Sequence, residues 1–290
     1  MDALNALLRA EMTAVNQQFI HILALRRLGD LRRADRLYDV DRVDFPNVMQ
    51  IIDHLVASGR SVALQPEMPK PGFPTTGLLQ AELQLEVRLN SVLEAEPADD
   101  RKYRPFFAAA LAPRAAYREW LAQELQAPDN RGGDPGPSDP ATDRLFSCLI
   151  LVLERMMIRA FIDWHQGARK AADIAWAASG VAMVQATALV NALTDLRSTP
   201  KLSAEVTKGA RDDRDLIAAY AEIADQASLS KADASLNQIY AKTAAYTRAL
   251  AAWQPNTTHP ALAVCTPAFK SFEATLKKFV WPKEAVDPSE

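Results

Sequence analysis

The chain has 290 residues, of which 49% are hydrophobic, 24% are charged and 10 are glycine, a balance that favours an all-α globular protein over a disordered or all-β one. Its net charge of −3 provides no general attraction to nucleic acid or to anionic lipid, so neither is expected as a partner. The length exceeds the size at which a single core usually stops growing, so we expect two domains.

Apolar residues at helical spacing predict helices in the first part of the chain. The first predicted helix ends at Gly29, which stands where a C′ glycine would close it, and the second stops at Ser58 and Gly59. Prolines and glycines between residues 66 and 77 predict an extended crossover before the third helix. The predicted helices cover residues 3–28, 43–56, 78–94 and 106–125.

Turn-forming residues dominate the segment 127–141, which has almost no apolar side chains. Such a composition is typical of a flexible linker, so we predict one domain over residues 1–126 and a second helical domain, of unknown relationship, over 142–290. The helices predicted in the second domain cover residues 145–164, 171–196, 212–226, 231–253 and 269–279.

Three segments of the first domain resemble one family. The segment LNALLRAEMTAVNQQFIH, residues 4–21, resembles the first helix of the bacterioferritin branch of ferritin-like proteins, in which Glu11 would be an iron ligand. The segment around Glu86 resembles the third helix, with Glu82 one turn earlier, and residues 114–125 resemble the end of the fourth. The resemblance therefore implies a ferritin-like four-helix bundle.

The same resemblance implies that the di-iron site is degenerate. In this family the second and fourth helices each supply a Glu-x-x-His pair, because residues i and i+3 share a helix face. Asp44 and Asn47 stand at the nearest positions of the second helix, with Pro46 between them, where it can bend or open the helix. Arg114 and Tyr117 replace the pair of the fourth helix. No histidine remains at either position.

Three interpretations of this site stay open. In the simplest, Glu11, Glu86 and Arg114 form ion pairs without a ligand, and the guanidinium supplies the charge of the lost metal. In the second, a metal-free pocket binds a small organic ligand. In the third, Fe or Mn is retained through Glu11, Asp44 and Glu86. The candidate pocket residues are Glu11, Asp44, Asn47, Glu86, Arg114 and Tyr117.

These observations predict a metal-free binding or protein-interaction module with no cofactor. The resemblance also implies association through the first two helices, so a homodimer through the N-terminal bundle is expected. The alternatives are an Fe- or Mn-dependent oxidase or oxygenase with a reduced carboxylate set, and a metal-free enzyme acting on a small apolar substrate. The sequence leaves open whether the chain is an enzyme, since it contains no GxGxxG, P-loop, GxSxG or paired CxxC motif.

The cysteines and the apolar runs bear on the compartment. Cys148 and Cys265 lie far apart and outside any CxxC pair, as expected of free thiols in a reducing compartment. The residues after Met1 lack the basic and apolar regions of a secretory signal. The most apolar run, 145–157, carries two charges and is too short to span a bilayer. We therefore expect a cytoplasmic protein with no membrane partner.

Overall fold

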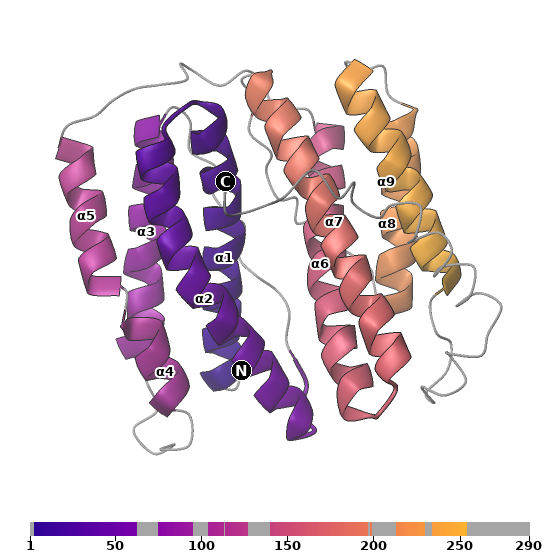
Figure 1. Ribbon diagram of the computed structural model, residues 1–290, viewed down its shortest axis with the longest axis horizontal. Coiled ribbons are helices and arrows are strands. Elements are labelled where there is room, and N and C mark those ends of the chain that lie inside the picture. The colour runs from indigo at the N-terminus through magenta and orange to yellow at the C-terminus, as the bar shows by residue number, and fades with distance from the viewer. Residues whose placement is uncertain are drawn as a thin grey trace. The chain divides into compact units, whose positions relative to one another are not determined.

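A computed structural model describes residues 3–62, 75–94, 104–112, 114–126, 140–196, 198, 213–229 and 234–253. All the regular secondary structure within these residues is helical (Figure 1), as predicted for an all-α protein. The chain divides into two compact units, residues 1–147 with 187–205, and residues 148–186 with 206–290. The helices confined to the first unit are α1 (Ala3–Arg27), α2 (Leu31–Ala57), α3 (Thr75–Glu94), α4 (Arg104–Leu111) and α5 (Arg114–Gln126).

A tight turn joins α1 to α2 (Figure 1). Gly29 adopts a left-handed φ of 76°, and its N–H donates to the Arg26 carbonyl at 3.1 Å. The next N–H, of Asp30, donates to the Leu25 carbonyl at 2.9 Å, which closes the end of α1. The Asp30 side chain then accepts from the Arg33 N–H and caps α2. The predicted end of the first helix at Gly29 is confirmed.

The second helix is longer than predicted. It begins at Leu31 rather than near residue 43, and it continues through Pro46. Its early turns bury Ala34 and Leu37, which extend the apolar face. Charged residues between these positions conceal the periodicity in the sequence. The proline therefore lies inside a helix that is continuous on both sides of it.

The predicted fourth helix, 106–125, is divided in the structure. Helix α4 ends at Leu111 and α5 begins at Arg114. Pro113 stands between them in the sequence, and a proline removes a helical hydrogen bond and clashes with the carbonyl four residues earlier. The prediction of one continuous helix was therefore wrong, whereas the first and third helices agree with α1 and α3 to within three residues at each end.

An apolar core joins four helices of the first unit. It contains Leu25 of α1, Leu37 of α2, Leu79 of α3 and Leu121 of α5, all nearly inaccessible to solvent. Burying one such side chain stabilises the fold by about 1.5–3 kcal/mol.

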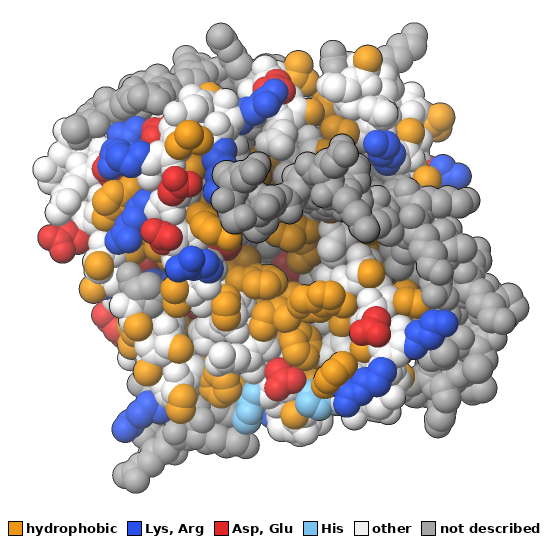
Figure 2. All heavy atoms as spheres, in the orientation of Figure 1, with side chains coloured by type: hydrophobic (Ala, Val, Ile, Leu, Met, Phe, Trp, Pro, Cys, Tyr) orange, Lys and Arg blue, Asp and Glu red, His pale blue; other side chains and the backbone are white. Residues whose placement is uncertain are grey.

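The surface carries charges of both signs. On the face drawn in Figure 2, acidic and basic side chains are interspersed, so no single sign of charge prevails there.

Ion pairs on α2 hold α5 in place. Arg32 donates two hydrogen bonds to the carboxylate of Glu124, at 2.6 and 2.7 Å. The neighbouring Arg33 donates through Nε to the same carboxylate at 2.9 Å. Two guanidinium groups on one glutamate fix the helix that carries Arg114 and Tyr117 against α2.

Four helices build the core of the second unit: α6 (Pro140–His165), α7 (Arg169–Asp195), α8 (Asp213–Ser228) and α9 (Ala234–Trp253). The Tyr246 hydroxyl of α9 donates to the Ala178 carbonyl of α7 at 2.7 Å, and burial raises the pKa of this tyrosine. Cys148 is buried and forms no disulfide with another described residue. Each helix predicted between 145 and 253 coincides with one of these, whereas the predicted helix 269–279, Cys265 and residues 127–139 of the predicted linker lie outside the described residues.

Within the described part of the chain, α7 is long and apolar enough to cross a membrane by length and composition. Half of its most apolar window is buried inside the protein. Ala175, Ala178 and Ala182 of this helix belong to the core of the second unit. A core helix of a globular protein has the same properties, so they do not by themselves assign α7 to a bilayer.

Candidate functional site

Side chains from α1, α2, α3 and α5 converge in the interior of the first unit. Glu11 and Glu86 are fully buried, and Asp44 and Arg114 are each 1% exposed. These positions lie on the inward faces of their helices, close to the apolar core described above. Ionisable side chains are rarely buried in this way unless they pair with one another.

Arg114 is the centre of this cluster. Its Nη1 donates to Oε1 of Glu86 at 2.5 Å, and its Nη2 donates to both carboxylate oxygens of Glu11 at 3.2 and 3.3 Å. Nη2 also lies 2.8 Å from Oδ2 of Asp44. The predicted contact of Arg114 with Glu11 or Glu86 is confirmed, and Asp44 is a third acidic partner. One guanidinium thus faces carboxylates from three helices.

The Nε donor of Arg114 is used within its own segment. Its Nε donates to the Ala110 carbonyl at 3.2 Å. That carbonyl belongs to the last turn of α4, where helices leave acceptors without an intrahelical partner. The break between α4 and α5 therefore helps to hold the arginine. With its fork spread over four acceptors, Arg114 has little capacity left to anchor a carboxylate ligand.

Glu82 is the centre of a second network beside the first. Its Oε1 lies 2.5 Å from Nδ1 of His21 and accepts from Nε2 of Gln17 at 3.4 Å. Its Oε2 accepts from the Tyr117 hydroxyl at 3.1 Å. Glu82 was not among the candidate site residues predicted from the sequence. Its spacing of four residues from Glu86 puts both glutamates on one face of α3, and this spacing could have identified it.

The two candidate residues of α2, Asp44 and Asn47, differ in their contacts. Oδ2 of Asp44 accepts from Nε2 of Gln18 at 3.3 Å in addition to its contact with Arg114. Asn47, one turn further along α2, is 4% exposed, and neither atom of its amide has a hydrogen-bond partner within the described ranges. The structure thus brings five of the six candidates into the two networks and leaves Asn47 outside both.

The acidic side chains hold protons more tightly than usual. Burial raises the pKa of Glu11 to about 8, with Arg114 opposing this shift and Asp44 and Glu86 adding to it. Burial likewise raises the pKa of Glu86 to about 7, again against the effect of Arg114. The pKa of Asp44 is raised for the same reason. For all three carboxyls the desolvation outweighs the charge of the one guanidinium, so burial favours their protonated forms.

Asp41 and Tyr117, which lie beside the cluster, also have raised pKa values. Burial raises the pKa of Asp41, one turn before Asp44, to about 7, and the charges of Asp44 and Glu82 add to the increase. The pKa of Tyr117 lies well above its usual value because the phenol is buried beside Glu82. Burial lowers the pKa of Arg114, but the charges of Glu11, Asp44 and Glu86 together raise it by more. The arginine is therefore the permanent cation of the cluster.

The described residues contain no group of three or more His, Cys, Asp or Glu side chains that could hold a metal ion. The carboxylates of Glu11, Asp44 and Glu86 instead face the Arg114 nitrogens at 2.5 to 3.3 Å. A divalent cation at this position would have to displace the guanidinium. The residues present therefore do not fit the Fe or Mn site that the resemblance offers as an alternative.

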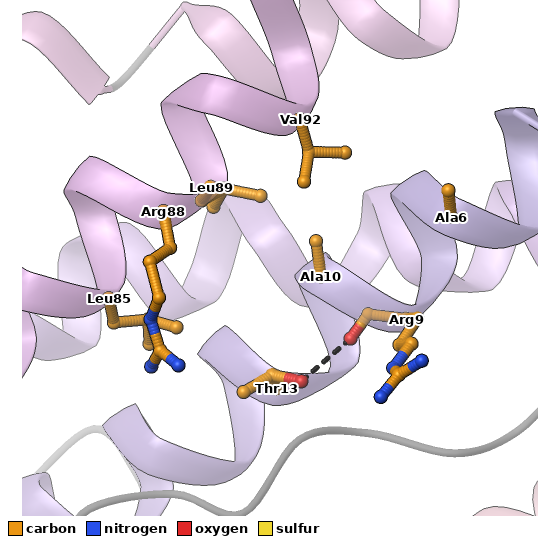
Figure 3. Close-up of a pocket in the computed structure, with 8 residues that line it drawn as sticks. All are labelled: Ala6, Arg9, Ala10, Thr13, Leu85, Arg88, Leu89 and Val92. Atoms are coloured by element: carbon orange, nitrogen blue, oxygen red, sulfur yellow. Dashed lines mark hydrogen bonds between the residues drawn. The ribbon is translucent and has the colours of Figure 1, made fainter. Parts of the chain in front are cut away.

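The described hollows of the first unit lie elsewhere. A groove of about 210 Å³ separates α1 from α3 (Figure 3). A second hollow, of about 320 Å³, shares Ala6 and Val92 with it and also reaches Phe107 of α4. The linings of both include none of the six candidate residues. The groove is lined by Ala6, Arg9, Ala10, Thr13, Leu85, Arg88, Leu89 and Val92.

No protein-family model, curated protein or solved structure matches the chain. Its function is therefore inferred from its own residues and their geometry.

Proposed function

We propose that the chain is a ferritin-like protein whose di-iron site has been replaced by an internal ion-pair network, and that it acts as a metal-free binding or protein-interaction module. The observation that carries this proposal is the position of Arg114, whose guanidinium contacts Glu11, Asp44 and Glu86. An arginine among three convergent carboxylates supplies positive charge where a cation would otherwise be needed.

The distribution of the cluster over the helices supports the ferritin-like part of the proposal. Glu11 comes from α1, Asp44 from α2, Glu86 from α3, and both Arg114 and Tyr117 from α5. This is the order in which the resemblance assigns ligand positions along the chain. A bundle with no such ancestry would fill these positions with leucine, because burying charges costs several kcal/mol per ion before pairing.

The chemistry of Arg114 supports a role in binding rather than in oxidation. Its donors are committed to Glu11, Glu86 and the Ala110 carbonyl, so the interior acts as a support for the fold. Binding would then use the outer faces of the helices. A rigid, internally neutralised bundle presents such faces with little loss of conformational entropy on association.

The homodimer belongs to the same proposal, with its contact surface on α2. Leu31 and Tyr38 are 59% and 41% exposed and lie seven residues apart on this helix. Phe45, a further seven residues along, is half-buried. Residues at this spacing share one face of a helix, so these three side chains offer apolar contacts on that face to a second copy.

Metal content tests the proposal. Protein expressed in medium replete with iron and manganese should carry well under one equivalent of either metal by elemental analysis. In Arg114→Ala the carboxylates of Glu11, Asp44 and Glu86 lose their cation, so this variant should take up added Mn²⁺ that the wild type does not. Arg118→Ala, on the same helix, is the matched control and should behave as the wild type. Circular dichroism would verify that both variants are folded.

Two irons bound per chain of the wild type would overturn the proposal and favour the oxidase alternative. Uptake of Mn²⁺ by the wild type at the level of Arg114→Ala would overturn it equally, because Arg114 would then not occupy the place of a cation.

A further inference from the structure

The outer face of α7 in the second unit exposes large apolar side chains. Trp176 and Met183 are each 47% exposed, although tryptophan is one of the residues that folded proteins bury most on average. They lie seven residues apart, so they share one face of the helix. Gly180 is exposed on the same face, four residues after Trp176. The face is therefore apolar over two turns.

Gly180 leaves open space between its two larger neighbours. A Cβ atom added at this glycine would meet no atom within 4 Å. The Trp176 ring beside it packs edge-on against Phe161 of α6, with 6.4 Å between the ring centroids. Helices pack most closely where a side chain of one enters a gap between side chains of the other. Gly180 provides such a gap next to an aromatic ring that is held from α6.

A segment of this chain beyond the described residues has an apolar face of its own. The sequence predicts a helix over residues 269–279, whose apolar residues recur at helical spacing, at Phe269, Phe272, Leu276 and Phe279. Three lysines stand between them, at Lys270, Lys277 and Lys278. Isolated helices of this length are marginal in water. Such a helix therefore needs a surface against which to bury its phenylalanines.

The connection to α9 brings α7 within reach of this segment. Helix α9 ends at Trp253, which belongs to the same core as Ala178 of α7, and the Tyr246 hydroxyl of α9 donates to the Ala178 carbonyl. Residues 254–268 can span at most about 50 Å. Helix α7 has 27 residues and is therefore about 40 Å long. A tethered segment has a high effective concentration at a surface that it can reach.

We propose that residues 269–279 form a helix that docks on the outer face of α7, with one phenylalanine seated over Gly180 between Trp176 and Met183. The contact removes apolar surface of both helices from water. The inference goes beyond the proposed function, since it involves neither the Arg114 cluster nor the exposed face of α2.

Hydrogen exchange of the full chain, measured by mass spectrometry, tests this docking. The amides of residues 270–279 should exchange at least tenfold more slowly in the wild type than in Trp176→Ser, which removes the ring without altering the segment. Gly180→Lys should accelerate their exchange equally, because it fills the gap with a charged side chain. Lysine is a better helix former than glycine, so this variant does not weaken α7.

The matched control is Trp164→Ser. Trp164 is 51% exposed, but it belongs to α6 and lies away from the proposed contact, so its replacement should leave the exchange of residues 270–279 unchanged. Acceleration by Trp164→Ser as large as that by Trp176→Ser would overturn the location. Circular dichroism would verify that all three variants are folded.

Three further results would contradict the proposal. Rapid exchange of residues 270–279 in the wild type would overturn the docking itself, and slow exchange that persists in both α7 variants would overturn the assignment to α7. Protection that increases with protein concentration would show that the docked segment comes from a second copy and would overturn the intramolecular contact. Metal content reports on Arg114 independently, so failure here and failure of the proposed function remain distinguishable.

Discussion

Nδ1 of His21 lies 2.5 Å from Oε1 of Glu82, and both side chains are fully buried. This pair gives Glu82 a partner of its own, which leaves the guanidinium of Arg114 to the other carboxylates. The Tyr117 hydroxyl completes the second network from α5. The interior therefore contains two adjoining polar networks, each of which joins α1 and α3 to α5.

The first prediction concerns Arg114. Replacement by methionine, which keeps an apolar stem of similar length, should lower the free energy of unfolding by about 3–5 kcal/mol at pH 8, the usual cost of stranding buried charge. The loss should be smaller at pH 5.5, where Glu11 and Glu86, with pKa values of about 8 and 7, hold protons. Urea unfolding followed by circular dichroism measures both values.

The control for this experiment is Arg32→Met. Arg32 pairs with Glu124 on the surface, where an ion pair contributes about 1 kcal/mol or less. A loss from Arg114→Met no larger than that from Arg32→Met would contradict a structural role for the buried cluster.

The second prediction concerns pH. The pKa of Glu11 is about 8 in the folded protein against an ordinary value of 4.5, so the folded state binds this proton more tightly than the unfolded chain. Its contribution to stability is complete below the ordinary pKa and is lost as pH rises through the folded value. Melting temperature should therefore fall between pH 5.5 and 8.5. Glu11→Gln should flatten this dependence, which differential scanning calorimetry can follow.

Glu124→Gln is the matched control for the pH experiment. Its hydrogen bond with Arg32 lowers the pKa of Glu124, so the stability it contributes is already complete above the ordinary pKa. Glu124→Gln should therefore leave the slope of melting temperature against pH unchanged between pH 5.5 and 8.5. A wild-type melting temperature that rises from pH 5.5 to 8.5 would show that the buried carboxyls are not protonated in the folded state.

The third prediction concerns Tyr117. Tyr117→Phe keeps the ring and its stacking on Trp120 but removes the donor to Oε2 of Glu82. Leaving a buried acceptor without its donor should cost about 1–3 kcal/mol. Tyr246→Phe likewise leaves a buried acceptor, the Ala178 carbonyl, without its donor, and it should cost a similar amount in thermal unfolding. A loss from Tyr117→Phe well below that from Tyr246→Phe would show that the contact with Glu82 does not stabilise the fold.

The fourth prediction concerns association through α2. Tyr38→Glu places a charge between Leu31 and Phe45 on this face and should convert the proposed dimer to a monomer, as measured by analytical ultracentrifugation. Gln50→Glu adds the same charge to an exposed residue of α2 that lies away from this face, and it is the control. A monomeric wild type, or a dimer unaffected by Tyr38→Glu, would place the surface elsewhere.

Much of the helical architecture was predictable from local patterns. Gly29 and Ser58 mark helix ends in the sequence as they do in the structure. The early turns of α2 were not predicted, because charged residues surround the buried Ala34 and Leu37 in the sequence, and packing against α1 stabilises the helix there. Pro113 indicated a break before Arg114, but the helical periodicity of the surrounding residues favoured one continuous helix.

The sequence predicted which residues belong to the site better than it predicted which of them contact one another. Glu11, Glu86 and Arg114 were identified from motif positions, and their mutual contact follows from a bundle in which the inward faces meet. The pairing of Glu82 with His21 depends on how far α1 and α3 are shifted along each other, which no local pattern encodes. Asn47 occupies a motif position yet lies outside both networks, since residue spacing does not determine which polar groups meet.

The cluster around Arg114 joins residues that are distant along the chain. Glu11 and Arg114 are separated by 103 positions and Glu86 and Arg114 by 28, whereas α1 and α2 meet across a short turn. Closing long loops and desolvating charges both oppose early formation of such contacts. The α1–α2 hairpin should therefore form before the folding transition state and the ion pairs after it. Arg114→Met should accordingly accelerate unfolding while leaving the rate of folding nearly unchanged.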